Sequence, residues 1–128
     1  MMRYASSATK VLTHACLSAR SYTHSLSICP SRSLYNNTLT GAIPADVGSL
    51  TSMITLYLFS NMLSGSVPSS ITKLTALTIL DLSRNQLSGS IPATISALTQ
   101  VSYLSLRSNQ LTGSIPVEIG SLLSLASL

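Results

Sequence analysis

Apolar residues recur along this chain with a fixed period of 24 residues, counted from one recurring asparagine to the next. Seven positions of each full period, and six of the shorter last one, hold Leu, Ile, Val or Met, and no charged residue occupies any of them. One coil of this composition cannot bury its own apolar side chains, so successive coils must stack. The pattern predicts a solenoid of four repeats. The asparagines that mark the repeats are Asn37, Asn61, Asn85 and Asn109.

Two leucines in each period are separated by a single residue, and they alternate with outward-facing side chains as in a half-buried strand. The pairs are Leu56 and Leu58, Leu80 and Leu82, and Leu104 and Leu106. One such strand per coil predicts a parallel sheet. Each period also holds a glycine, which we expect where a Cβ would obstruct a tight backbone path. These glycines are Gly41, Gly65, Gly89 and Gly113. Each period holds a proline as well, which we expect on the outer side of the coil or at the start of a short helical turn; the prolines are Pro44, Pro68, Pro92 and Pro116.

The recurring asparagine has two interpretations. Its amide can both donate and accept hydrogen bonds, so a column of such amides could satisfy buried backbone groups at the turn after each strand. We expect this internal role, because the asparagine precedes an inward leucine and lies at a turn. The alternative is a row of ligand-binding amides.

Two stretches carry a family resemblance. Residues 74–92 read LTALTILDLSRNQLSGSIP and residues 98–116 read LTQVSYLSLRSNQLTGSIP, and both closely resemble the plant-type leucine-rich repeat. The resemblance covers residues 34–128. It implies an α/β-type repeat solenoid whose parallel sheet lines a concave face, with a second short strand around each Leu-Ser/Thr-Gly segment. Members of the family include receptor-like kinases, receptor-like proteins and secreted inhibitors of cell-wall-degrading enzymes.

The chain departs from the family at both ends. The family's N-terminal cap carries a cysteine pair and a tryptophan, whereas this chain has no tryptophan and its Cys16 and Cys29 lack that context. No recognisable cap follows the last repeat, because the pattern ends at Leu128, the first inward leucine of a partial fifth repeat. We expect a fragment, a truncated gene model, or an edge that pairs with another chain.

Charge divides the chain near residue 33. Residues 1–33 form a basic leader rich in Ser and Thr, with no acidic residue, and they supply the whole net charge of +4. This composition predicts a disordered segment or an organelle transit peptide; a leader without function, a weak secretory signal and an atypical cap remain alternatives. The family resemblance instead implies an extracellular or plasma-membrane location. The repeat region is neutral, so we expect no nucleic acid partner.

The repeat region offers little material for catalysis. Its carboxylates, Asp46, Asp81 and Glu118, lie in three different repeats, and both histidines of the chain lie in the leader. No catalytic triad, metal site, cofactor site or phosphate-binding loop can be assembled from these residues. We therefore predict that the chain is not an enzyme and needs no cofactor or metal. No apolar stretch is long enough to predict a membrane span.

The outward positions of the strands are the candidate binding surface. Aromatic residues and arginine are enriched at binding hot spots, and several stand in these columns. The candidates on the concave face are Tyr35, Tyr57, Phe59, Asp81, Arg84, Tyr103 and Arg107. A polar peptide or a glycan laid across the strands would suit them; the alternative is a surface without function. Asn36, in Asn36-Asn37-Thr38, is a candidate N-glycosylation acceptor.

These observations predict non-catalytic recognition of a protein or peptide by a fragment of a receptor-like ectodomain. Three alternatives stay open. The chain could inhibit a secreted cell-wall hydrolase, act as an organellar or intracellular scaffold, or form part of a receptor kinase whose catalytic region follows Leu128.

Overall fold

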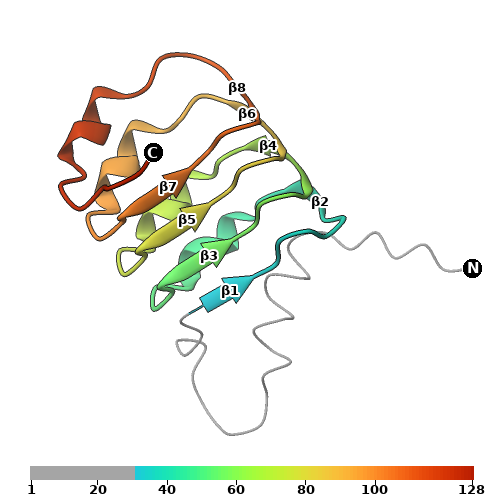
Figure 1. Cartoon of the computed structure of the whole chain (residues 1–128), viewed down its shortest axis with the longest axis horizontal. Helices are drawn as coiled ribbons and strands as arrows, with labels where there is room; N and C mark the ends of the chain where they lie inside the picture. Colours follow the sequence, from blue (N-terminus) through green and yellow to red (C-terminus); the bar gives the residue numbers. More distant parts are fainter. Residues whose placement is uncertain (1–30) are drawn as a thin grey trace, which may run out of the picture.

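The computed structural model describes residues 31–128, which form stacked coils of strands and 3-10 helices (Figure 1). Each coil contributes one short strand to a first parallel sheet, in which Leu56, Leu80 and Leu104 lie in register on neighbouring strands. Its strands, in spatial order, are β1 (Ser31–Ser33), β3 (Thr55–Tyr57), β5 (Ile79–Asp81) and β7 (Tyr103–Ser105). This sheet is the one that the Leu-x-Leu pattern predicts.

The first strand begins earlier than the sequence pattern indicates. Residues Ser31–Ser33 were assigned to the leader, but they pair with β3, with Arg32 in register with Leu56. The position that holds leucine in later coils holds arginine here, so the apolar column does not reveal this strand. The predictions for residues 1–30, including those for Cys16 and Cys29, lie outside the described residues.

A second parallel sheet runs beside the first. Its strands, in order, are β2 (Thr40–Ala42), β4 (Met62–Ser66), β6 (Gln86–Gly89) and β8 (Gln110–Leu111). These strands lie where the family resemblance implies a second short strand. The recurring glycines belong to this region, and each has a left-handed backbone, with φ between 75° and 85°.

Backbone torsion, rather than crowding, explains these glycines. We expected a Cβ at each of them to be obstructed, but a Cβ at Gly41 would meet nothing within 4 Å, and one at Gly65 would meet only Ala42, at 3.3 Å. A positive φ is unfavourable for any residue with a side chain and free for glycine. The glycine is therefore required by the turn of the chain itself.

Four 3-10 helices form the side of the coils away from the first sheet, behind its strands in Figure 1. Each begins directly after one of the recurring prolines, whose φ lies between −60° and −70°. A proline at this place donates no N–H and presets an extended entry to the helix. The helices are η1 (Ala45–Ser49), η2 (Ser69–Lys73), η3 (Ala93–Ala97) and η4 (Val117–Ser121).

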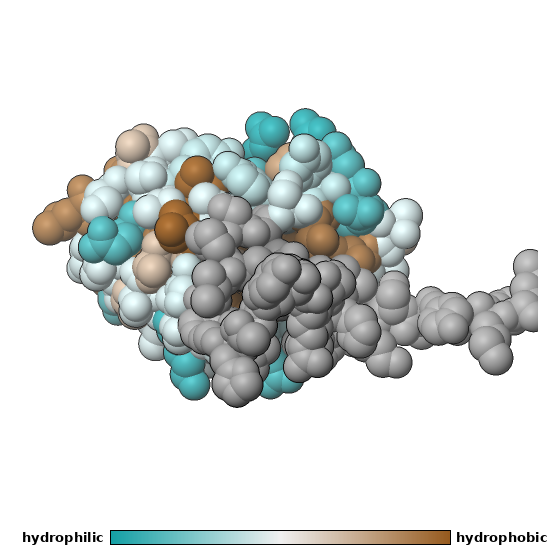
Figure 2. All heavy atoms as spheres, turned by 90° about the horizontal axis from the view of Figure 1, so that it is seen from below, coloured by the Kyte–Doolittle hydropathy of each residue, from teal (hydrophilic) through white to brown (hydrophobic). Residues whose placement is uncertain are grey.

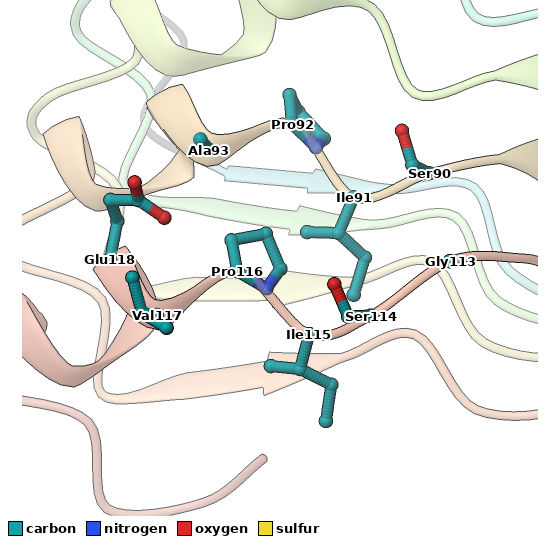
Figure 3. A pocket seen from close by; sticks show the side chains of 10 residues that line it. All are labelled: Ser90, Ile91, Pro92, Ala93, Gly113, Ser114, Ile115, Pro116, Val117 and Glu118. Carbon is teal, nitrogen blue, oxygen red and sulfur yellow. The ribbon is translucent and has the colours of Figure 1, made fainter.

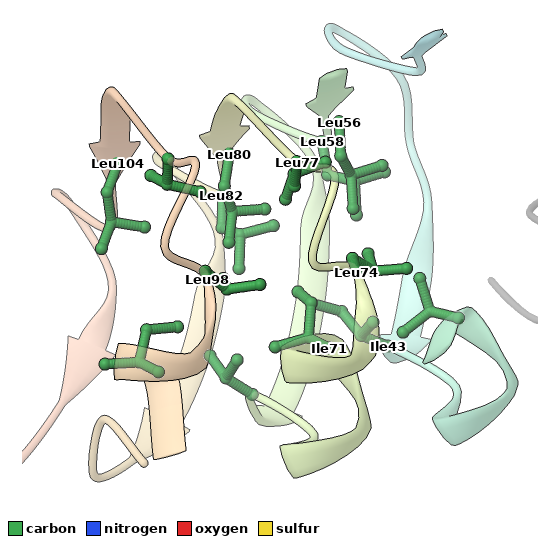
Figure 4. Packing of buried hydrophobic residues seen from close by; sticks show 14 of the residues in the cluster. Ile43, Leu56, Leu58, Ile71, Leu74, Leu77, Leu80, Leu82, Leu98 and Leu104 are labelled. Carbon is green, nitrogen blue, oxygen red and sulfur yellow. The ribbon is translucent and has the colours of Figure 1, made fainter. Parts of the chain in front are cut away.

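The core is a continuous apolar column between the sheets and the helices. Figure 4 shows the leucines of successive coils lying in rows beneath the strands, with Leu74, Leu98 and Ile71 on the helical side. Leu80 and Leu104 are fully buried. Burial of one such side chain stabilises the fold by about 1.5–3 kcal/mol. Because each coil covers the next, this stabilisation comes from stacking rather than from any coil alone.

The recurring asparagines connect neighbouring coils by hydrogen bonds. The Asn85 amide nitrogen donates to the carbonyl of Leu58 in the preceding coil at 2.9 Å and to that of Leu82 in its own coil at 3.1 Å. Its amide oxygen accepts from the N–H of Leu63 at 3.0 Å. Asn61 and Asn109 make the same set of bonds. In the first coil, Asn37 is exposed, and within residues 31–128 its amide nitrogen donates only to carbonyls of its own coil.

Apolar exposure rises in the last described coil. Ile115 is 63% exposed, whereas Ile43 at the same position of the first coil is 3% exposed. Leu128 is 62% exposed, although its counterparts in earlier coils are fully buried. Another layer of chain would cover these positions; the predicted edge pairing with another chain stays a prediction. Within residues 31–128, no helix combines the length and apolarity that a membrane crossing requires.

Candidate functional site

The candidate surface is the outward side of the first sheet, which we call the sheet face. Residues on the strands alternate, so those flanking the buried leucines point away from the core. Register places Tyr57, Asp81 and Ser105 side by side on β3, β5 and β7. A second row, just after the strands, holds Tyr35, Phe59, Ser83 and Arg107.

Three aromatic residues meet at one end of the sheet face and form what we call the aromatic cluster: Tyr35, Tyr57 and Phe59. The rings of Tyr35 and Phe59 stack with centroids 4.6 Å apart and planes within 4° of parallel. Tyr57 meets Phe59 edge to face, with a centroid separation of 6.2 Å. Such contacts are favourable beyond the burial of the rings and favour this arrangement.

Asp81 lies deeper in the sheet face than its sequence position suggests. We expected an exposed carboxylate, but only 9% of the residue is accessible, and its Oδ1 accepts a hydrogen bond from the N–H of Ser83 at 3.0 Å. Ser83 and Ser105 are also buried, at 3% and 7%. Small polar residues therefore form a floor between the aromatic cluster and the last strand. Asp81 sits on a central strand, with a strand on each side.

The remaining predicted residues lie around this floor. Tyr103, on β7, is 37% exposed, and Arg107 is exposed just after that strand. Arg84 is also exposed, but it occupies a left-handed turn beyond β5 with φ of 53°, and its N–H donates to the carbonyl of Arg107 at 3.0 Å. The structure thus brings the aromatic cluster and Asp81 onto one surface and places Arg84 at its margin.

Two residues of the floor were left out of the predicted site. Ser83 and Ser105 occupy the same outward columns as the aromatic residues, so the alternation along each strand identifies both. Neither carries the charge or aromatic ring that marks a hot spot, and neither was therefore chosen.

A shallow groove of about 560 Å³ lies on another side of the molecule, between the third and fourth coils (Figure 3). Its walls include the Ile91 and Ile115 side chains and the prolines that precede η3 and η4. Glu118 is the only titratable residue among those that line it. Two serine hydroxyls, of Ser90 and Ser114, line the groove with it, and no histidine, cysteine or second carboxylate does. Over the residues that the structure describes, no group of three potential metal ligands is present.

The surface seen from below in Figure 2 is mostly polar, with apolar side chains in separate groups outside the grey atoms. Among the described residues, the exposed large apolar side chains gather toward the last coil, which holds Ile115, Val117, Leu123 and Leu128. Exposed apolar residues such as Ile54 and Met62, farther back along the chain, need no functional explanation by themselves.

Comparison with known proteins gives a family and a set of structural neighbours. Residues 55–111 match the leucine rich repeat family model, and no curated protein matches the chain. A solved TDR receptor is 43% identical, with a TM-score of 0.79 over 80% of this chain and 18% of that chain. The plant peptide hormone receptor RGFR1, solved in complex with RGF2, is 41% identical, with a TM-score of 0.73 over 74% and 15%.

A shorter neighbour is the BIR3–SERK2 complex from Arabidopsis thaliana, which is 39% identical, with a TM-score of 0.67 over 74% of this chain and 53% of that chain. The chain is a plant-type leucine-rich repeat protein. Its structural neighbours include ectodomains of plant receptor kinases. The chain spans between 12% and 53% of the length of the neighbours compared.

Proposed function

We propose that this chain recognises an extended segment of a protein or peptide on its sheet face and has no catalytic activity of its own. The observation that carries the proposal is the aromatic cluster, which lies beside the buried polar residues Asp81, Ser83 and Ser105. Preordered aromatic rings offer a large contact area without a further loss of side-chain freedom. Arg107 and Tyr103 extend the surface across β7 and add polar contacts.

The solved neighbours support recognition as the mode of action. RGFR1 is described as a peptide hormone receptor in complex with RGF2, and HAESA was solved with the peptide hormone IDA and the co-receptor SERK1. HAESA is 42% identical over 71% of this chain. These partners belong to those proteins. For this chain the neighbours support a peptide as the ligand class, and we propose a receptor-like ectodomain as its setting.

The absence of catalysis is proposed from the residues themselves. Asp46 and Glu118 are exposed in the first turns of two different 3-10 helices, and Asp81 is held by Ser83 on the sheet face. The three carboxylates belong to three different coils, and general acid–base catalysis needs its groups within reach of one substrate. Inhibition of a cell-wall hydrolase is the nearest alternative, and it predicts slower sugar release by a pectin-degrading hydrolase. No observation favours it, or the scaffold and kinase alternatives, over peptide recognition.

The experiment uses the full chain, immobilised and exposed to a phage-displayed library of random peptides. Enriched peptides are synthesised, and their affinity is measured for the parent and for the combined variant Tyr57→Ala, Phe59→Ala and Arg107→Ala. We expect the combined variant to lose binding. Circular dichroism and the melting temperature verify that it still folds.

A matched triple variant on the other side supplies the control. Val117→Ala, Glu118→Ala and Leu123→Ala remove three exposed residues away from the first sheet, and two of the three line the groove of Figure 3. We expect this variant to bind like the parent. Loss of binding in the control variant alone would move the site to the groove, and the absence of any enriched peptide would reject the proposal.

We also propose that Asn36 accepts an N-linked glycan if the chain passes through a secretory compartment. Asn36 and Thr38 are both exposed, and Asn36 stands in a left-handed turn with φ of 53°. An exposed turn of this kind is open to a modifying enzyme. A mass increase that is removed by an endoglycosidase, and is absent from Asn36→Gln, would support both the site and an extracellular location.

A further inference from the structure

Residues 31–128 hold two methionines, and their environments are opposite. Met62, on β4, is 42% exposed, whereas Met53 is 1% exposed and belongs to the apolar core. A peroxide oxidises a methionine to the sulfoxide where it can reach the thioether sulfur, so susceptibility follows exposure. The fold therefore separates one accessible methionine from one protected methionine.

Met62 stands in a column that is otherwise polar. It directly follows a recurring asparagine, and the residues that do so in the other coils are Thr38, Gln86 and Gln110. All three are exposed, and so is Thr40, which lies in register with Met62 on β2. The fold thus accepts a polar side chain at this position. A sulfoxide, whose oxygen accepts hydrogen bonds, should fit there as glutamine does.

Met53 stands in an apolar column instead. Leu77 and Val101 occupy the same position of the next two coils, and both are fully buried. A sulfoxide at Met53 would place a polar oxygen among apolar side chains, which is unfavourable unless the oxygen finds a hydrogen-bond donor. Peroxide can reach this sulfur only when this part of the stack opens.

We propose that Met62 is a site of reversible oxidation by hydrogen peroxide, which makes an apolar position of the second sheet polar while the chain stays folded. The thioether sulfur attacks one peroxide oxygen, the O–O bond breaks, and the other oxygen leaves as water after proton transfer. The sulfur is oxidised and the peroxide is reduced. A sulfoxide reductase supplied with a dithiol reverses the change: the added oxygen leaves as water, and the dithiol becomes a disulfide. Reaction at Met62 needs no bound peptide.

The test treats the full chain with hydrogen peroxide and stops the reaction at intervals. Chymotrypsin then cuts after Tyr57, which separates the two methionines, and mass spectrometry measures the fraction of each that has gained an oxygen atom. We expect Met62 to react at least about tenfold faster than Met53 in buffer, and both to react at the same rate in concentrated urea. Equal rates in buffer, or a Met62 that reacts much more slowly in buffer than in urea, would overturn the proposal.

Two variants separate the reaction from its effect on the fold. Met62→Leu removes the sulfur and keeps an apolar side chain, so the fast reaction should disappear while Met53 stays protected. Met62→Gln imitates the sulfoxide, and we expect its melting temperature to lie within about 3 °C of the parent's. A much larger fall for Met62→Gln would overturn the proposal.

The oxidised parent completes the comparison. Met62→Leu treated with peroxide in the same way is its matched control, because it reports oxidation elsewhere in the chain. We expect the two treated proteins to melt within about 3 °C of each other. The two stereospecific sulfoxide reductases together should remove the added oxygen from Met62. A treated parent that unfolds while treated Met62→Leu does not, or an oxygen that the reductases leave in place, would contradict reversible oxidation of the folded chain.

Discussion

The amide oxygen of Asn85 accepts a hydrogen bond from the backbone N–H of Leu63, one coil earlier, at 3.0 Å. The bond joins two coils, because Asn85 follows β5 and Leu63 belongs to β4. The same side chain donates to the carbonyls of Leu58 and Leu82. These backbone groups are buried at the turn, so water cannot replace the amide if it is removed.

We therefore expect Asn85→Ala to lower the free energy of unfolding by about 1–3 kcal/mol, measured by urea denaturation. Asn37→Ala is the matched control, because Asn37 is exposed and, among the described residues, its side chain bonds only within its own coil. Asn37→Ala should lower the free energy of unfolding clearly less than Asn85→Ala does. Asn85→Asp adds a second comparison, since it keeps the acceptor but not the amide donor. Equal stability of Asn85→Ala and the parent would show that the ladder does not support the fold.

Glycines at equivalent positions of η1 and η4 give opposite predictions. A Cβ at Gly48 would lie 2.5 Å from the backbone oxygen of Ser70 in the next coil, whereas a Cβ at Gly120 would meet nothing within 4 Å. Gly48→Ala must push η1 away from η2, so we expect it to destabilise the fold by about 1–3 kcal/mol. Gly120→Ala should be neutral or stabilise by up to about 1 kcal/mol, because it restricts the unfolded chain.

Thermal melting of the two variants tests this contrast, since both introduce the same methyl group in the same kind of helix. If both variants melt at the same temperature, the close approach of η1 and η2 is not maintained in solution. The comparison therefore measures the packing between coils separately from helix propensity.

The repeat pattern predicted the fold well, because the recurring apolar positions are those that become buried when the coils stack. The outward residues were harder to interpret. Alternation correctly placed Tyr57 and Asp81 on one face, but it does not reveal how deep a side chain lies between its neighbours, and Asp81 is buried there. The start at Ser31 was missed for a related reason, since Arg32 stands in the leucine register of β1. A short strand without its apolar residue is visible only through its pairing.

The recurring glycines test whether torsion or space limits the second sheet. Gly41 has a φ of 85°, and a Cβ added there would meet no atom within 4 Å. Gly41→Ala therefore isolates the loss of stability caused by the left-handed backbone alone. We expect a loss of about 1–2 kcal/mol in the free energy of unfolding. Gly41→Asn should cost less, because asparagine tolerates this region better than other residues with a side chain. A larger loss for Asn than for Ala would indicate that space, not torsion, is limiting.

The stacked rings of Tyr35 and Phe59 can be tested without a ligand. Their parallel contact at 4.6 Å should contribute about 0.5–1.5 kcal/mol beyond simple burial. A double-mutant cycle with Tyr35→Ala, Phe59→Ala and the combined variant isolates this coupling from the effects of each residue alone. Tyr103 supplies the control, because it lies two coils from Phe59 and shares no ring contact with it among the described residues.

We expect the cycle of Tyr35 with Phe59 to show positive coupling and that of Tyr103 with Phe59 to show almost none. Urea unfolding followed by circular dichroism gives the four stabilities that each cycle needs. Coupling near zero for both pairs would mean that the rings move freely in solution, and a partner would then have to order them on binding. Such ordering would lower the affinity that the aromatic cluster can supply, because the loss of side-chain freedom opposes association.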